Sequence, residues 1–130
     1  MASLFTRILR GEIPCHKVAE DERFLAFLDI APLREGHTLV IPKMEVDKFF
    51  DLPTDVLAAI MPFAQRVARK IANVVPCDRV GVSVIGLEAP HAHVHLIPID
   101  SVHDMDLSRP KLKFAQEELA AIAERIRNAW

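Results

Sequence analysis

The sequence predicts an α+β fold built on an antiparallel sheet, with one long helix and a C-terminal helix. β-rich runs occur in pairs separated by short segments that contain Gly or Pro, and two other stretches repeat apolar residues at helical steps of three and four. The strands and helices do not alternate as β-α-β, which argues against a parallel sheet. A chain of 130 residues with 51% hydrophobic residues is expected to form a single domain over residues 1–130.

The first half of the chain contains two β-rich runs that should pair as a hairpin. Residues 23–29 are rich in aliphatic and aromatic side chains, and residues 30–36 then carry Pro and Gly. Residues 37–41 form the second run. Pro42 should end it, because a residue without an N–H group cannot serve a central ladder.

A long amphipathic helix is expected between residues 51 and 75. Pro53 suits its first turn, whereas Pro62 falls inside the pattern and should kink the helix or divide it. The apolar positions that define its buried face are Val56, Leu57, Ile60, Phe63, Ala64, Val67, Ala68 and Ile71.

The second half of the chain repeats the strand pairing and then adds a helix. Residues 79–85 and 91–99 are β-rich and are separated by five residues, a length that favours an antiparallel pair. After Pro110, an amphipathic C-terminal helix is marked by Phe114, Leu119, Ile122 and Ile126.

Composition excludes several classes of function. With 16 basic and 18 acidic residues the chain has no broad positive field for a nucleic-acid backbone, and its apolar stretches are far shorter than the roughly 20 residues that cross a bilayer. Residues 1–7 lack the pattern of a secretion signal. Cys15 and Cys77 are far apart, which argues against a disulfide framework and a thiolate zinc site. We expect a cytoplasmic protein with no nucleic-acid or membrane partner.

Three histidines alternate with apolar residues in the run His91-Ala92-His93-Val94-His95. In a strand the three imidazoles would share one face, about 6.5–7 Å apart, and the apolar residues would face the core. One phosphate could then touch two or three rings. Because burial of adjacent imidazoles costs desolvation energy and invites repulsion on protonation, the pattern favours a functional site over an inert core.

Two kinds of chemistry fit such a face. A neutral imidazole is a good nucleophile near pH 7, and its attack on an α-phosphate would give a P–N intermediate that water can hydrolyse. A metal site is the alternative, since His-x-His on a strand can present two nitrogens to zinc at about 2.0–2.1 Å. Against it, no Cys is nearby, and Glu88 and Asp100 have no spacing that demands coordination. We therefore expect no metal, with a metal-binding protein as an alternative.

The run at residues 91–97 resembles the signature of the histidine triad (HIT) family, in which histidines alternate with apolar residues. Residues 4–14, 26–30 and 36–43 are similar to that family's opening and central segments. The resemblance covers about residues 4–99 and leaves a C-terminal extension with a helix over about residues 100–130. It implies an antiparallel HIT-like sheet, a homodimer, and a purine nucleotide hydrolase or nucleotidyl transferase that cleaves bonds to the α-phosphate without a cofactor. The nucleoside phosphoramidase-like branch matches best.

The resemblance also implies a role for each site residue. His93 would be the nucleophile, with His95 and His91 orienting it and contacting phosphate. His37 would support His91, and Asp29 would accept hydrogen bonds from the ribose hydroxyls. The base would be walled by Leu4, Phe5, Ile8, Phe27 and Ile30. Judged without the family, Phe5, Ile8 and Phe27 fit a core, which is the commoner place for such residues. Asp29 would then cap the turn before Pro32, and His37 would be an ordinary histidine at a strand end.

The sequence departs from the family just before the triad. The family often has Gly-Gln-Ser/Thr there, whereas residues 86–90 read Gly-Leu-Glu-Ala-Pro. Glu88 in the nucleotide site should weaken anion binding unless it turns away or meets a cationic leaving group. This departure keeps open the alternative of a non-catalytic protein that binds a nucleotide or a partner.

Overall fold

The computed structural model describes residues 3–129. Met1 and Ala2, at the start of the segment 1–7, and Trp130, at the end of the predicted C-terminal extension, lie outside the described residues. A five-stranded sheet in the order β1-β2-β3-β5-β4 forms its centre, and each neighbouring pair is antiparallel. The strands are β1 (Lys17–Glu20), β2 (Phe24–Leu28), β3 (Thr38–Pro42), β4 (Arg79–Ser83) and β5 (Val94–Ile99). The α+β class predicted from the sequence is confirmed.

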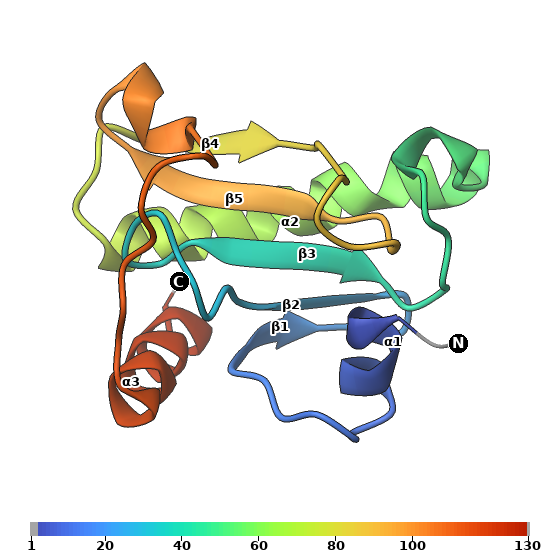
Figure 1. Cartoon of the computed structure of the whole chain (residues 1–130), viewed down its shortest axis with the longest axis horizontal. Coiled ribbons are helices and arrows are strands. Elements are labelled where there is room, and N and C mark those ends of the chain that lie inside the picture. Colours follow the sequence, from blue (N-terminus) through green and yellow to red (C-terminus); the bar gives the residue numbers. More distant parts are fainter. Residues whose placement is uncertain (1–2, 130) are drawn as a thin grey trace.

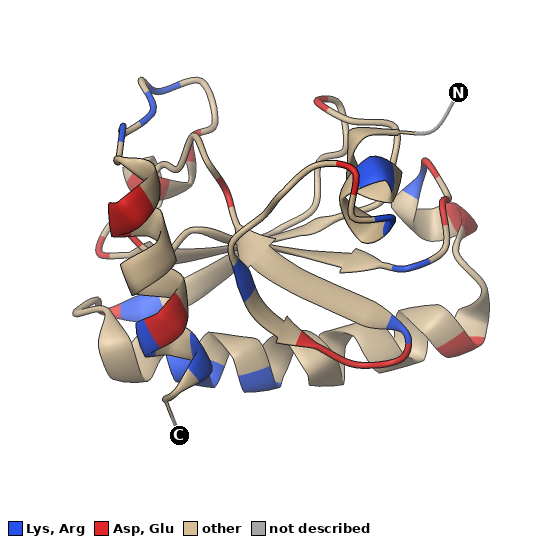
Figure 2. Ribbon diagram, turned by 90° about the horizontal axis from the view of Figure 1, so that it is seen from below, with Lys and Arg blue, Asp and Glu red and all other residues tan. Residues whose placement is uncertain are grey.

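Helices lie on both sides of this sheet. Figures 1 and 2 show α2 along one face and α1 on the opposite side, while α3 stands beside the β1 edge. The helices are α1 (Leu4–Leu9), α2 (Thr54–Val74) and α3 (Gln116–Arg127), with short 3-10 turns at Phe49–Asp51 and Val102–Met105. Within residues 3–129, no helix combines the length and the apolar character needed to span a membrane.

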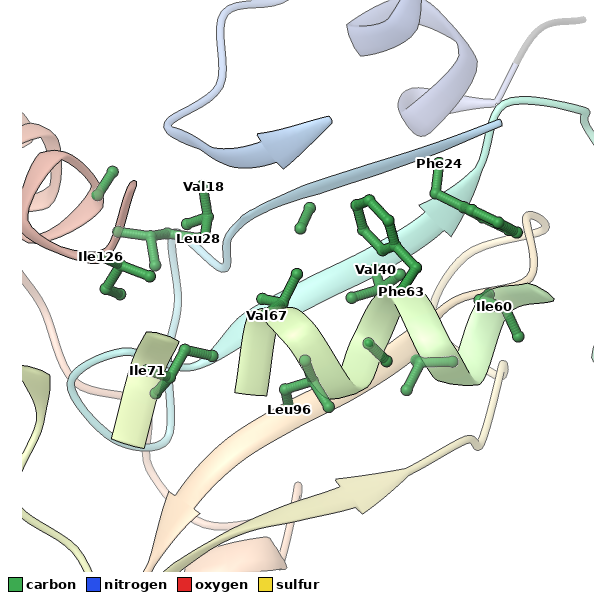
Figure 3. Packing of buried hydrophobic residues seen from close by; sticks show 14 of the residues in the cluster. Val18, Phe24, Leu28, Val40, Ile60, Phe63, Val67, Ile71, Leu96 and Ile126 are labelled. Atoms are coloured by element: carbon green, nitrogen blue, oxygen red, sulfur yellow. The ribbon is translucent and has the colours of Figure 1, made fainter. Parts of the chain in front are cut away.

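Alternation along the strands gives the sheet two buried faces. Successive side chains along each strand point alternately toward α2 and toward α1. The cluster under α2 includes Phe24, Ala26, Leu28, Val40, Val94 and Leu96 together with Ile60, Phe63, Val67 and Ile71 of the helix (Figure 3). The cluster under α1 consists of Phe5, Leu25, Phe27, Leu39 and Ile41. Both faces are therefore shielded from water, but only the first is a large core.

Both predicted strand pairs form. β2 pairs with β3 along its whole length, with Phe24 opposite Pro42 at one end and Leu28 opposite Thr38 at the other. β4 pairs with β5. Both strands of the second pair are shorter than predicted, since β4 ends at Ser83 and β5 begins at Val94. The ten residues between them leave the ladder and are free to form a site.

The long helix forms as predicted, but Pro62 does not divide it. α2 runs unbroken for 21 residues with Pro62 inside. Pro62 and Ala58, the residue whose carbonyl loses its intrahelical partner, are both exposed, so water can serve that carbonyl. The buried residues Ile60 and Phe63 hold the helix on the sheet on either side of the proline.

Two elements, α1 and β1, were absent from the sequence prediction. α1 has only six residues, too few for a helical period to stand out. β1 has four residues, Lys-Val-Ala-Glu, of which only Val18 is buried. The predicted C-terminal helix does form, and it packs on β1, β2 and α2 of its own chain.

Candidate active site

A cavity of about 240 Å³ opens on the sheet face that α1 covers. His93 and His95, two of the four predicted catalytic histidines, line it. All seven residues predicted to bind the nucleotide line it as well, namely Leu4, Phe5, Ile8, Phe27, Asp29, Ile30 and Glu88. The structure therefore joins a polar end with two imidazoles to an apolar wall.

The register of the sheet places the floor of this cavity. Phe27 pairs with Leu39 and Leu39 pairs with His95, so these three side chains form a row across one face. Beyond the row, the Asp29 N–H donates to the carbonyl of His37 over 3.0 Å. Gly36 makes the turn into His37 with φ of +91°, and a Cβ there would lie 3.0 Å from a Val75 methyl, so only glycine fits.

Helix α1 covers the floor and is held by its N-terminus. The Ser3 side chain accepts from the Thr6 N–H, which caps the helix, and Glu45 accepts from the Ser3 N–H over 2.8 Å and from the Thr6 hydroxyl. Phe5 then packs edge-on against His93, with ring centroids 5.2 Å apart. The helix therefore fixes one wall of the pocket and excludes water from one side of the His93 ring.

The backbone sets the tautomer of His93. Its Nδ1 lies 2.8 Å from the carbonyl oxygen of His91, which can only accept, so Nδ1 carries a proton. Nε2 is the nitrogen that faces the cavity. An imidazole anchored in this way presents one ring position, Nε2, to any group that enters the pocket.

The tautomer of His95 is set by a longer chain of donors. The Leu33 N–H donates to Nδ1 of His37 over 3.1 Å, so the proton of a neutral His37 ring lies on Nε2. That Nε2 donates to Nδ1 of His95 over 2.9 Å, which leaves His95 with its proton on Nε2, toward the cavity. Burial lowers the pKa of His37 to about 3 and also lowers the pKa of His95, so both rings are neutral near pH 7.

His91 does not face the cavity. Its Nε2 donates to the carbonyl of Pro42 over 2.9 Å, and its Nδ1 lies 3.1 Å from the Ser3 hydroxyl. His37, which was expected to support His91, contacts His95 in the structure. The His91 ring is buried beneath the start of α1 and does not line the cavity, so the structure does not bring it together with His93 and His95 there. What His91 offers the nucleophile is its carbonyl group.

The triad is thus not a single extended run of strand. Only His95 belongs to β5, and the centroids of the His93 and His95 rings are 5.0 Å apart, closer than along a regular strand. Ala92 and Val94 do belong to the core under α2, as predicted. Two rings, not three, converge on the cavity.

Glu88 reaches the point where these two rings converge. Its Oε1 lies 2.6 Å from Nε2 of His93 and 3.0 Å from Nε2 of His95. Partial burial by itself would raise the pKa of Glu88, but hydrogen bonds from His95 and His93 outweigh it and lower that pKa to about 2. Glu88 does not turn away from the site, and its carboxylate oxygen occupies a position suited to a phosphoryl oxygen.

Asp29 also lines the cavity. Its Oδ1 accepts from the Ala31 N–H over 2.9 Å, as a turn cap does, and its Oδ2 lies 3.7 Å from Nε2 of His37. Burial raises the pKa of this carboxyl group. One oxygen therefore shapes the local turn while the other remains near the cavity.

Six residues that line the cavity were not predicted from the sequence. They are Ile13, Pro14, Cys15, Leu28, Leu39 and Ala89. Leu39 was within reach, because it stands two residues after His37 and shares its face in an extended strand. Cys15 had no such signal, since its place depends on how the loop after α1 returns to the sheet.

The convergence of Glu88, His93 and His95 has to be weighed against metal binding. One potential ligand atom from each lies within 4.8 Å of the others, as it does for Asp29, His37 and His95. Atoms bound about 2.0–2.1 Å from a tetrahedral zinc are roughly 3.3 Å apart. The 2.6 Å between Glu88 and His93 is shorter than that and suits a shared proton.

Comparison with known proteins shows where this architecture recurs. The chain is 35% identical to an adenosine 5'-monophosphoramidase of Schizosaccharomyces pombe, over 97% of this chain and 96% of that protein. A HIT-like protein from Bartonella henselae, crystallised with an unknown ligand, matches with a TM-score of 0.85 and 29% identity over 98% of this chain and 96% of the other. A zinc-bound histidine triad protein of Mycobacterium smegmatis matches with a TM-score of 0.83 and 26% identity, over 98% and 91% of the two chains.

The family model for the HIT domain matches residues 10–102, a span that includes the whole sheet and the three alternating histidines. Together with identity to a relative over nearly the entire length, this match shows that the chain belongs to the histidine triad (HIT) family.

Proposed function

We propose that this protein is a hydrolase or nucleotidyl transferase that cleaves bonds to the α-phosphate of purine nucleotides through a covalent intermediate on His93. The observation that carries the proposal is the fixed ring of His93, whose Nδ1 is anchored on the His91 carbonyl while Nε2 faces the cavity. Anchoring one nitrogen leaves the other as the attacking atom. The alignment needed for attack is then built in before substrate binds.

In the first step, the electron pair of His93 Nε2 attacks phosphorus and the leaving group departs with the electrons of the broken bond. His95 donates its Nε2 proton in a hydrogen bond to a phosphoryl oxygen and stabilises the charge that develops there. Water then displaces the histidine in the second step and releases a nucleoside monophosphate. The hydrogen bond from His37 keeps His95 in its donor tautomer throughout.

The rest of the cavity supports a nucleoside as the bound group. Its apolar wall of Leu4, Phe5, Ile8, Phe27 and Ile30 suits a flat base, and purine is the class proposed. Asp29 lines the same cavity, and its Oδ2, the oxygen that does not accept from Ala31, could accept hydrogen bonds from ribose hydroxyls. The name of the yeast relative, a monophosphoramidase, favours phosphoramidates as substrates, with acyl-nucleotides and dinucleoside polyphosphates as further members of the proposed class.

We also propose that the chain is a single domain that acts as a homodimer in the cytoplasm, with no nucleic-acid or membrane partner. β4 is an edge strand, and Val82, Val84 and Ile85 on or just after it are exposed. Such an edge suits pairing with a second copy. Light scattering in solution tests this, and a mass of one 14.6 kDa chain at micromolar concentration would contradict it.

Covalent trapping tests the function. The protein is mixed with an adenosine phosphoramidate in the presence of a chelator, quenched within one turnover, and digested for mass spectrometry. We expect one adenosine monophosphate on His93 and none on the protein carrying His93→Ala. Full turnover by His93→Ala would exclude the mechanism. Tight nucleotide binding without turnover would favour the non-catalytic alternative, and loss of labelling on chelation would favour a metal protein.

A further inference from the structure

We propose that Glu88 is a catalytic acid and base, which takes the proton from Nε2 of His93 as substrate enters and delivers it to the leaving group. The inference rests on the proposed function and assigns it a further residue. Its basis is the contact of the Glu88 Oε1 atom with both ring nitrogens that face the cavity, at 2.6 Å from His93 and 3.0 Å from His95.

The contact with His93 fixes where a proton must lie in the free protein. An ionised carboxylate only accepts hydrogen bonds, so Nε2 of His93 has to carry a proton to make this one. Nδ1 already donates to the carbonyl of His91. With both nitrogens protonated, the ring has no electron pair for phosphorus, and the Nε2 proton must leave before attack.

Glu88 is the group placed to accept that proton. Nε2 of His95 is held as a donor by the chain through His37, and the His91 ring lies outside the cavity with both nitrogens engaged. Asp29 contacts His37 rather than His93. Among the described lining residues, Glu88 is the carboxylate in hydrogen-bond contact with the attacking nitrogen.

Substrate binding would drive the transfer. A phosphoryl oxygen placed between the two Nε2 atoms displaces the carboxylate, which loses the hydrogen bonds that hold its pKa low and faces a like charge. Both changes favour the protonated carboxyl group. The loop allows the displacement, because the Glu88 side chain is 44% exposed and Gly86, at φ of +83°, has open space around it.

The transferred proton then completes the reaction. As the P–N bond to the leaving amine breaks, its electron pair stays on nitrogen, which takes the proton from Glu88 and leaves as a neutral amine. In the second step Glu88 accepts a proton from the attacking water while the bond between phosphorus and Nε2 breaks. That proton returns to Nε2 and restores the resting pair of His93 and Glu88.

The decisive comparison uses Glu88→Gln with two adenosine monophosphate derivatives. One has an alkylamine leaving group, which needs a proton, and the other has p-nitrophenol, which leaves as a stable anion. We expect release of the amine in the first turnover to fall about 10²–10⁴-fold and release of nitrophenolate to fall less than about tenfold. Equal losses for both, as from misplaced groups, or no loss for either, would overturn the proposal.

Two further measurements separate this proposal from the function it rests on. Nitrogen NMR of the free protein near pH 7 should show both nitrogens of His93 protonated in the wild type and only Nδ1 protonated in Glu88→Gln. An unprotonated Nε2 in the wild type would overturn the role of Glu88 even if the nucleotidyl-histidine forms. Failure to form that intermediate, with the NMR result as expected, would instead refute the proposed function.

Asp47→Asn is the matched control. It removes the same charge, is exposed, and forms none of the ion pairs seen within residues 3–129. We expect Asp47→Asn to leave the release rates of both leaving groups and the NMR signals of the His93 nitrogens unchanged. An equal response to Asp47→Asn would assign the effect to net charge and overturn the specific role of Glu88.

Discussion

The face of the sheet under α2 and the face under α1 are built from the same central strands, yet they bury different chemistry. Under α2 the strands contribute mainly to an apolar core, closed by a 21-residue helix. Under α1 a six-residue helix covers a small apolar cluster and leaves a cavity beside two imidazoles. Val94 and His95 are neighbours in sequence and belong to opposite faces. The contrast teaches that the packed core on one face holds the strands in place, so that the other face can keep an unfilled space with polar groups at one end.

The most direct test of this division compares two substitutions in the same segment, one on each face of the sheet. Leu96→Ala, on the core face, should lower the free energy of unfolding by about 2–5 kcal/mol and leave turnover per folded molecule within a few-fold. His93→Ala should lower turnover by about 10⁴-fold or more and cost less stability, because its ring borders a cavity. Urea unfolding and single-turnover rates measure the two effects.

A large loss of turnover in folded Leu96→Ala would show that the faces are not independent. The complementary failure would be His93→Ala with its activity intact. Either outcome would remove the division of labour, since the two residues come from the same segment and differ in the face they occupy.

The second prediction concerns acid, which should affect the histidine face first. Burial holds the pKa of His37 at about 3, against an ordinary 6.5. Between these two values the imidazole is protonated in the unfolded chain and neutral in the folded one. Stability is therefore complete above pH 6.5 and falls as pH drops through the window toward 3. The contribution of His37 should be about 2 kcal/mol between pH 6.5 and 5, at roughly 1.4 kcal/mol per pH unit.

Thermal unfolding of His37→Asn at several pH values checks this. The variant should lose less stability between pH 6.5 and 5 than the wild type does, and the exposed His103→Asn should follow the wild type. Glu88 and Glu45, with pKa values of about 2, respond at lower pH and do not confuse the window. An unchanged slope in His37→Asn would mean that His37 is already protonated in the folded state.

Most of the fold could be predicted from the sequence, because the apolar residues of its main elements recur at the regular spacing of a helix or a strand. The apolar positions of α2 and the alternation in β2, β3 and β5 predict which side chains face the core. α1 and β1 could not be read, because elements of six and four residues owe their structure to tertiary contacts such as Glu45 with Ser3.

The candidate site could be predicted only in part, because some of its contacts follow from local alternation and others from tertiary structure. Alternation correctly sends Ala92 and Val94 to the core and predicts that His93 and His95 share a face. It does not predict that the His91 ring stays out of the cavity, because that ring lies against Ser3 and Phe5 beneath the start of α1, a contact between distant segments of the chain. The pairing of His37 with His95 depends on the register of β3 and β5, which no local pattern encodes.

The smallest expected effect is at Asp29, where the polar and apolar parts of the functional face meet. Asp29→Asn keeps the oxygen that accepts from the Ala31 N–H but loses the charge offered to ribose. A hydrogen bond to a charged group contributes about 1.5–3 kcal/mol and one between neutral groups about 0.5–1.5 kcal/mol, so loss of the charge should cost about 1–1.5 kcal/mol and raise KM for a ribonucleoside phosphoramidate about tenfold. KM for the 2',3'-dideoxy analogue should hardly change, because that analogue has no hydroxyl to lose. A fall in kcat with KM unchanged would contradict ribose binding and indicate that Asp29 acts through His37, whose Nε2 is 3.7 Å away. The comparison of the two analogues therefore decides whether the carboxylate belongs to substrate binding or to the histidine relay.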